Sequence, residues 1–184
     1  MDEKKERLDG GYDGMLIATR VALAVAAVGL VIAFFLPWAS ADDAYREAAA
    51  QAPEIVVYED AGITTAQAAD LSLLEFAQIY GSMEGTWTLY MYLMYGLLGI
   101  SAVSLLCAAA GKPVVTSVFA LLACALSRLL VWDYEDRGAL PNATYDWGIA
   151  PAIYLGATVA IVAIAVWMVV IRRKGKATQA TVGA

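Results

Sequence analysis

Four long apolar runs constrain the fold of this chain more than any other feature of its sequence. They cover residues 15–36, 87–110, 113–132 and 147–171, and none contains an aspartate or a glutamate. A helix needs about 20 mostly apolar residues to cross a bilayer. A chain of 184 residues is too short to bury four such helices in a soluble core. The sequence therefore predicts an all-α membrane protein with four transmembrane helices.

The lysines and arginines indicate how these helices are oriented. Of the 12 basic residues, eight lie in residues 1–14, 111–112 and 172–184, and only two lie in residues 37–86 and 133–146. Short cytoplasmic segments carry an excess of Lys and Arg. We therefore expect an antiparallel four-helix bundle in the cell membrane, with both termini cytoplasmic. The two segments poor in basic residues would lie outside, the larger one forming a small mixed helix-and-strand cap.

Acidic residues give the two outer segments a strong negative charge. Residues 37–86 hold nine acids and one arginine, and residues 133–146 hold four acids and one arginine. The net charge of the whole chain is −6 and the sequence pI is about 4.6. Such a balance excludes nucleic acid as a partner, because binding it needs a basic surface. The acids either keep the outer loops soluble, or take part in binding another membrane or envelope protein, or gather cations.

The stretch "FFLPWASADD", residues 34–43, allows two interpretations. Ala39-Ser40-Ala41 fits the small-x-small pattern of a signal-peptide cleavage site, which would leave three spans. The preceding apolar run of 22 residues is longer than a signal-peptide core of about 7–15 residues, and residues 1–14 hold five acids against three bases. We therefore expect an uncleaved first span, ended by Pro37 and anchored by Trp38.

The sequence of the first half of residues 37–86 predicts one helix and one strand. Ser40 followed by Asp43 resembles a helix N-cap, and Pro53 would end that helix. Residues 55–58 are β-branched or aromatic and favour a strand. A strand needs a hydrogen-bonding partner, so we expect it to pair with residues 139–146 or with a second molecule.

Two further local signals mark helix ends. Thr64 and Gln67 form a capping-box pattern that opens an amphipathic helix extending to Tyr80. Gly111 lies just after the second run and Pro113 begins the third, which is the arrangement expected of a tight turn between two helices.

Arg128 is the one charge that lies well inside an apolar run. A charge in a span is costly and needs either an ion partner or access to the interface. It lies four residues before Trp132, so its side chain can reach the outer surface. We expect it to form a structural ion pair with an outer acid, the candidates being Asp133, Asp146 and Glu84.

Small residues recur at every fourth position of the last run. They are Gly148, Ala152, Gly156 and Ala160. Small residues so spaced let two helix backbones approach closely. They predict a helix-packing face, used either inside the bundle or between copies in a homo-oligomer.

The sequence offers no catalytic or metal-binding pattern. It has no histidine and two cysteines, Cys107 and Cys124, which suit apolar packing better than redox chemistry. The clustered acids Asp133, Glu135 and Asp136 match no calcium-loop spacing. We therefore expect no enzyme activity, no cofactor and no metal.

The predicted arrangement resembles that of claudins and tetraspanins in topology only. The outer segment lacks the Trp-Gly-Leu-Trp and paired cysteines of claudins and the Cys-Cys-Gly of tetraspanins. The most consistent function is an accessory or structural subunit that binds another membrane or envelope protein, or itself, through the acidic cap or the small-residue helix faces. The alternative is a small transporter or channel component in which outer carboxylates gather cations and Arg128 acts as a gate.

Overall fold

Four long helices dominate the structure. A computed structural model describes the backbone of residues 2–182 and the side chains of residues 14–173. The long helices are α1 (Asp2–Ile32), α5 (Thr88–Ala109), α6 (Pro113–Asp136) and α7 (Ala150–Val182). Each contains a stretch long and apolar enough to cross a membrane, within Gly14–Ile32, Gly85–Ala109, Pro113–Asp136 and Ala150–Arg173. Four such helices suggest a multi-pass membrane protein.

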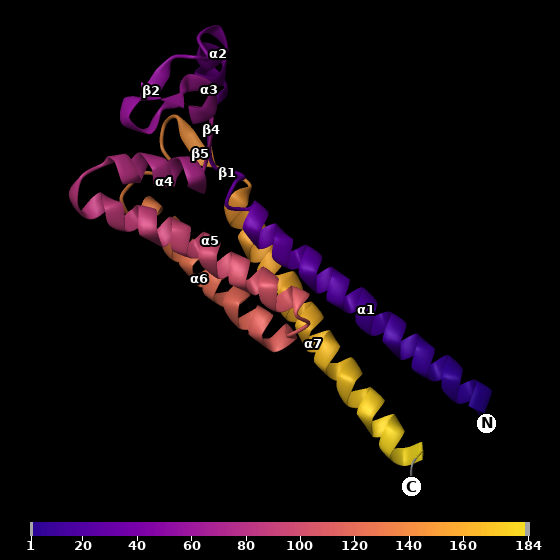
Figure 1. The fold of residues 1–184 in the computed structure, drawn as a ribbon. Helices are drawn as coiled ribbons and strands as arrows, with labels where there is room; N and C mark the ends of the chain where they lie inside the picture. Colours follow the sequence, from indigo (N-terminus) through magenta and orange to yellow (C-terminus); the bar gives the residue numbers. More distant parts are fainter. Residues whose placement is uncertain (1, 183–184) are drawn as a thin grey trace.

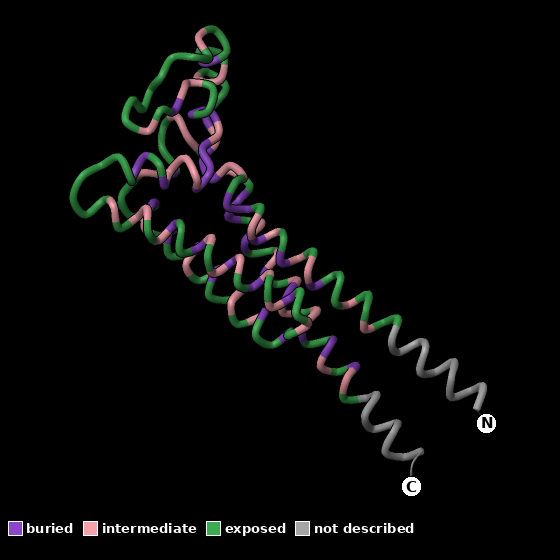
Figure 2. The backbone as a smooth tube through the Cα atoms, in the orientation of Figure 1, coloured by how far each residue is buried: buried purple, intermediate pink, exposed green. Residues whose placement is uncertain are grey.

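The four long helices pack side by side and form what we call the helical stem. α1 contacts α7 and α5, and α6 contacts α5 and α7. The first turns of α1 and the last turns of α7 lie at the end of the stem away from the short elements (Figure 1). Buried residues follow the facing sides of the helices and gather where the stem meets those elements (Figure 2).

Small residues and hydroxyls mediate the helix contacts. An added Cβ on Gly29 of α1 would lie 3.5 Å from Ala157 Cβ of α7. Thr158 Oγ1 donates to Ala120 O at 3.2 Å, and Ser104 Oγ donates to Thr116 O at 3.1 Å. Small side chains allow the close approach that such packing needs in an apolar surrounding.

The turn between α5 and α6 follows the sequence prediction. Gly111 has φ +67° and Pro113 is the first residue of α6. Arg172 Nη2 donates to Gly111 O at 3.2 Å, so α7 is tied to this turn. A cation here also faces the negative end of the α5 dipole.

A three-stranded antiparallel sheet lies at the other end of the stem. β1 (Pro37–Ala41) is central and pairs with β4 (Asp70–Ser72) and with β5 (Tyr145–Trp147). β5 comes from the connection between α6 and α7, whereas β1 and β4 come from the connection between α1 and α5, so the two connections build one unit, which we call the cap. The Ala39-Ser40-Ala41 tripeptide is part of β1, and cleavage after Ala41 would detach the central strand from its neighbours.

Short elements complete the cap. They are α2 (Asp43–Gln51), β2 (Val56–Tyr58), η1 (Glu59–Ala61), β3 (Ile63–Thr64), α3 (Thr65–Ala68), α4 (Leu73–Ser82) and η2 (Gly85–Trp87). α4 packs along α5 and thereby joins the cap to the stem.

Four local predictions need correction. α1 ends at Ile32, and Pro37 and Trp38 lie in β1, where Trp38 is fully buried, so Pro37 does not end the helix and Trp38 does not anchor it at the interface. The N-cap of α2 is Asp42, which accepts a hydrogen bond from Tyr45 N at 2.8 Å, whereas Ser40 lies in β1. β2 pairs with β3, not with residues 139–146, because a two-strand hairpin satisfies it locally. The capping box at Thr64 forms, but its helix ends at Ala68; β4 intervenes, and a second capping box, Ser72 with Glu75, opens α4.

The junction of cap and stem is densely packed with aromatic rings. Trp38, Tyr134 and Tyr154 are fully buried there. The Trp38 ring lies 6.1 Å from that of Tyr154 and 6.4 Å from that of Trp147. Next to them, Gly148 N donates to Trp38 O at 2.8 Å. The cap therefore rests on a base that is continuous with the stem core.

Candidate interaction surface

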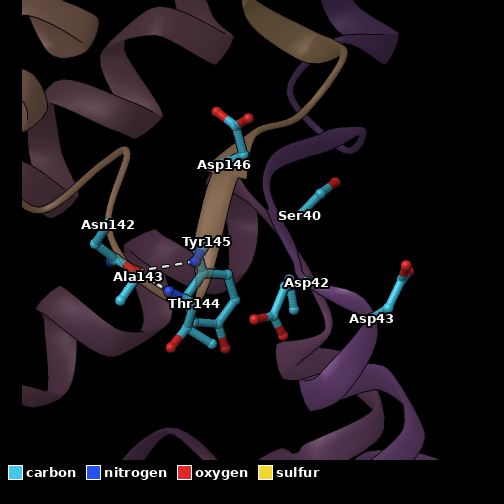
Figure 3. Close-up of a pocket in the computed structure, with 9 residues that line it drawn as sticks. Ser40, Asp42, Asp43, Asn142, Ala143, Thr144, Tyr145 and Asp146 are labelled. Carbon is cyan, nitrogen blue, oxygen red and sulfur yellow. Dashed lines mark hydrogen bonds between the residues drawn. The ribbon is translucent and has the colours of Figure 1, made fainter.

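An open groove with acidic walls runs along one side of the cap. Its volume is about 380 Å³, and it lies between the start of α2 and the loop that leads into β5. Three carboxylates belong to its lining, those of Asp42, Asp43 and Asp146 (Figure 3). The groove thus concentrates negative charge contributed by both connections that build the cap.

Hydrogen bonds fix the loop that forms one wall of the groove. Asn142 Oδ1 accepts from Thr144 N at 2.8 Å and from Tyr145 N at 2.9 Å (Figure 3). Asn142 Nδ2 donates to Ala139 O at 2.8 Å. Tyr145 Oη donates to Ala68 O at 2.9 Å, which ties the loop to α3. The groove therefore has a defined shape.

The groove does not bring a metal-binding set together. Asp42 already caps α2, and Asp146 Oδ1 accepts from Trp147 N at 2.7 Å. Over the part of the chain whose side chains are described, no three His, Cys, Asp or Glu residues are placed to hold a metal ion. Cys107 and Cys124 are half-buried free thiols in α5 and α6.

An apolar strand lies exposed in the cap. Ile55, Val56, Val57 and Tyr58 are between 37% and 57% exposed. β2 belongs to a two-stranded sheet, so among residues 14–173 only β3 pairs with it and its other edge is open. Glu54, Glu59 and Asp60 border this strand and are exposed. An open, apolar strand edge of this kind is a template for pairing with another chain.

A polar cluster holds α2 against the sheet. Arg46 Nη1 and Nη2 donate to the two carboxylate oxygens of Asp70 at 2.8 and 2.7 Å, and Arg46 Nε donates to Ala41 O at 3.0 Å. Ser40 Oγ donates to Asp70 Oδ1 at 2.8 Å. The Arg46 hydrogen bonds, with help from Ser40 and against partial burial, hold the pKa of Asp70 below its ordinary value. The two-pronged geometry makes this pair more directional than a lysine pair would be.

A second polar cluster lies at the end of α6 next to the cap and centres on Arg137. Its Nε and Nη2 donate to Asp133 Oδ2 at 2.9 and 2.5 Å. Tyr90 Oη donates to Asp133 Oδ1 at 3.0 Å, and Arg137 Nη2 donates to Tyr80 Oη at 3.4 Å. Burial by itself would lower the pKa of Arg137, but the hydrogen bonds to Tyr80 and Asp133 raise it above its ordinary value.

Three aromatic rings surround the same guanidinium. Arg137 Cζ lies 4.6 Å from the ring centroid of Tyr90, 5.3 Å from that of Tyr134 and 5.5 Å from that of Trp87. These distances are within the range of cation–π attraction. Sequence reasoning missed this cluster, although the i,i+4 spacing of Asp133 and Arg137 among aromatic residues was a usable signal.

The structure does not bring Arg128 together with the acids proposed as its partners. Arg128 is exposed on α6, and it forms no ion pair with any residue in the range 14–173. Asp133 bonds instead to Arg137, Asp146 lines the groove, and Glu84 is exposed before η2. The physical reason is rotation along the helix: Arg128 projects from α6 on a different side from the buried Ser127 and Val131.

The predicted small-residue face is not the side of α7 that packs inside the stem. Ala152 and Gly156 are exposed and Ala160 is half-buried, whereas the buried face of α7 contains Tyr154, Thr158, Ile161, Ala165 and Met168. Of the two glycines in this row, Gly148 lies close to Pro37, and Gly156 has no atom within 4 Å of an added Cβ. Within the chain, the small-residue positions therefore do not form the main packing face of α7.

No family model, curated protein or solved structure matches this chain. Its surfaces must be interpreted from their own chemistry.

Proposed function

We propose that the protein is a non-enzymatic accessory subunit of the cell membrane whose cap docks another membrane or envelope protein. The observation that carries this proposal is the open edge of β2. It is apolar, bordered by acids, and part of a cap whose base is packed on the stem. An apolar surface with a charged rim is typical of protein interaction sites.

The surface indicates the chemistry of the partner. An open strand edge binds an extended segment by main-chain hydrogen bonds, and the side chains at alternate positions give specificity. Glu54, Glu59 and Asp60 beside β2 favour a segment that carries lysine or arginine. The acidic groove extends the same preference across the cap, since Tyr145 and Asn142 border both the groove and an apolar pocket that reaches Tyr58.

The same proposal includes the orientation in the membrane. We place both termini in the cytoplasm and the cap outside, because Lys and Arg gather at the ends of the chain and at the turn between α5 and α6. The position of the cap at one end of the stem, with the start of α1 and the end of α7 at the other, supports this assignment (Figure 1).

Site-specific photo-crosslinking tests the proposal. A photoreactive residue at Val57, on β2, should give a discrete covalent adduct with one membrane or envelope protein in intact cells. The matched control is the same residue at Ala50, which is exposed on α2. The double variant Glu59→Lys with Asp60→Lys should reduce the Val57 adduct about tenfold or more without lowering the melting temperature. Equal labelling at both positions, or an adduct insensitive to charge reversal, would contradict the proposal.

The transport alternative has less support. Among residues 14–173, the buried polar side chains are serines, threonines and tyrosines, and none is charged. Arg128 is exposed, not directed into the stem. Ion flux through the purified protein in liposomes would favour the alternative over docking. Disulfide formation between copies carrying Gly156→Cys, in a background without Cys107 and Cys124, would show that the partner is a second copy.

A further inference from the structure

Two arginine side chains from different helices meet at the turn between α5 and α6. Arg172 of α7 donates from Nη2 to Gly111 O at 3.2 Å. An added Cβ on Gly111 would lie 3.3 Å from Arg20 Nε and 3.5 Å from Arg20 Cζ, so the guanidinium of α1 lies against the same residue. Lys112, the next residue of the turn, is exposed. Three elements thus bring cations together at the end of the stem away from the cap (Figure 1).

No carboxylate of the described residues balances these cations. Among residues 14–173, every aspartate and glutamate lies in residues 42–84 or 133–146, in the cap or beside it. The carbonyl end of α5 supplies about half a negative charge, which is less than the charge of one guanidinium. Within the same range, Arg172 makes one hydrogen bond and neither arginine makes an ion pair. Most of their N–H groups are therefore left for an anion, which would also offset the repulsion between the two cations.

Exposed apolar side chains adjoin the cations and indicate what kind of anion fits. Val21 follows Arg20 and is 58% exposed, and Val114, two residues after Lys112, is 62% exposed. A soluble anion gains nothing from such a surface, whereas the acyl chains of a lipid do. The planar fork of arginine matches the oxygens of a phosphate group. Basic sites between membrane helices bind the headgroups of anionic lipids in this way.

We infer that Arg20, Lys112 and Arg172 bind a phosphate group, and that an anionic phospholipid of the adjoining leaflet supplies it. The guanidinium groups of α1 and α7 donate to the phosphate oxygens, and the acyl chains lie along the exposed apolar side chains of α1 and α6. The site shares no residue with the acidic groove or with β2, and it lies at the other end of the stem. It rests neither on the docking function nor on the direction in which the stem crosses the membrane.

Native mass spectrometry of the full chain in a neutral detergent tests the inference. Titration with phosphatidylglycerol and with phosphatidylcholine gives the affinity of the protein for each lipid. Both lipids carry a phosphate, but the choline cation of phosphatidylcholine would lie among like charges. Phosphatidylglycerol should therefore bind about tenfold more tightly or better. Equal affinities for the two lipids would overturn the inference.

Single substitutions test the location. Arg20→Met and Arg172→Met should each weaken phosphatidylglycerol binding about tenfold, the value of a charge-assisted hydrogen bond. Arg173→Met is the matched control, because it removes the same charge from the next, exposed position of α7. It should change the affinity less than about threefold, since a neutral micelle has no charged surface to attract a cation.

Melting temperatures show whether each variant folds. Arg172→Met removes a hydrogen bond to Gly111, whereas Arg20→Met removes none to the described residues, so Arg20→Met decides the outcome if Arg172→Met is unstable. Equal affinities in the Arg20→Met and Arg173→Met proteins would overturn the site.

Glycerol phosphate identifies the source of the phosphate, because it carries the same headgroup without acyl chains. It should not displace phosphatidylglycerol even in about hundredfold excess, since acyl chains on the apolar surface add to the affinity. Displacement within this excess would show that a soluble phosphate is the ligand and would overturn the lipid assignment.

Discussion

The cap and the helical stem are stabilised by different means. In the cap, directional polar contacts join short elements, as in the Arg46–Asp70 pair and the two capping boxes. In the stem, no charged side chain of the described residues is buried, and the helices meet through small residues, hydroxyls and apolar contacts. The difference follows from the solvent. Water can form hydrogen bonds with any exposed polar group of the cap, whereas a bilayer offers the stem no hydrogen-bonding partner. We therefore expect substitutions that remove a polar contact and substitutions that add a side-chain atom to differ in their effects between the two regions.

The largest effect should come from a steric change where cap and stem meet. A Cβ on Gly148 would lie 2.1 Å from Pro37 O, which is backbone of β1 and cannot move aside. Gly148→Ala should lower the free energy of unfolding by about 3 kcal/mol, measured by denaturation in detergent. Gly156→Ala is the matched control from the same row of small residues, because nothing lies within 4 Å of its added Cβ. Its stability should be unchanged or raised by up to about 1 kcal/mol. Similar losses of unfolding free energy in Gly148→Ala and Gly156→Ala would contradict the steric explanation.

The Arg137 cluster should give the next largest effect, because it is polar but lies at the end of the stem. Arg137→Met removes the ion pair and the cation–π contacts and leaves Asp133, whose side chain is 25% exposed, without its cation. We expect a loss of about 1–2 kcal/mol, measured as above. Arg137→Lys should recover only part of it, since lysine lacks the planar fork. Full recovery would show that charge alone matters.

The Arg46–Asp70 pair should contribute less, since both side chains are 40% exposed and water screens the attraction. Asp70→Asn should cost about 0.5–1 kcal/mol at neutral pH. The pKa of Asp70 is lowered in the folded state, so its contribution is complete above the unfolded pKa of about 4 and is lost as pH falls through the lower folded value. Melting temperatures of the parent and the variant should therefore converge in acid. A gap that widens on acidification would contradict this assignment.

Arg128 should matter least among these residues. It is exposed, and within the range 14–173 it has no ion partner. Arg128→Met should change the free energy of unfolding by about 0.5 kcal/mol or less. The variant is matched to Arg137→Met, since the same substitution is made in the same helix. A loss as large as that of Arg137→Met would indicate a partner that the isolated chain does not contain.

Local signals predicted much of the secondary structure. Each of the four apolar runs lies largely within a long helix, as expected, because the bilayer imposes a minimum length on each span, although α1 and α7 extend well beyond their runs. Capping chemistry is also local, so the box at Thr64 and the turn at Gly111 formed as expected. The longer helix expected after Thr64 failed because Asp70 and Leu71 pair with β1 and interrupt it. That pairing joins segments about thirty residues apart, which no local pattern encodes.

The sequence by itself determined that four helices contain stretches long and apolar enough to cross a membrane, and it located those apolar stretches to within about five residues, although α1 begins earlier and α7 ends later than the apolar runs. Only the tertiary structure decided which side of each helix is buried. Side chains that face lipid are as apolar as those that face a neighbouring helix, so hydropathy does not distinguish the two sides of a span. For this reason Ala152 and Gly156, which the sequence placed on a packing face, are exposed in the single chain. For the same reason Arg128 was expected to pair with Asp133, whereas the ion pair of Asp133 is formed by Arg137 at the end of the same helix.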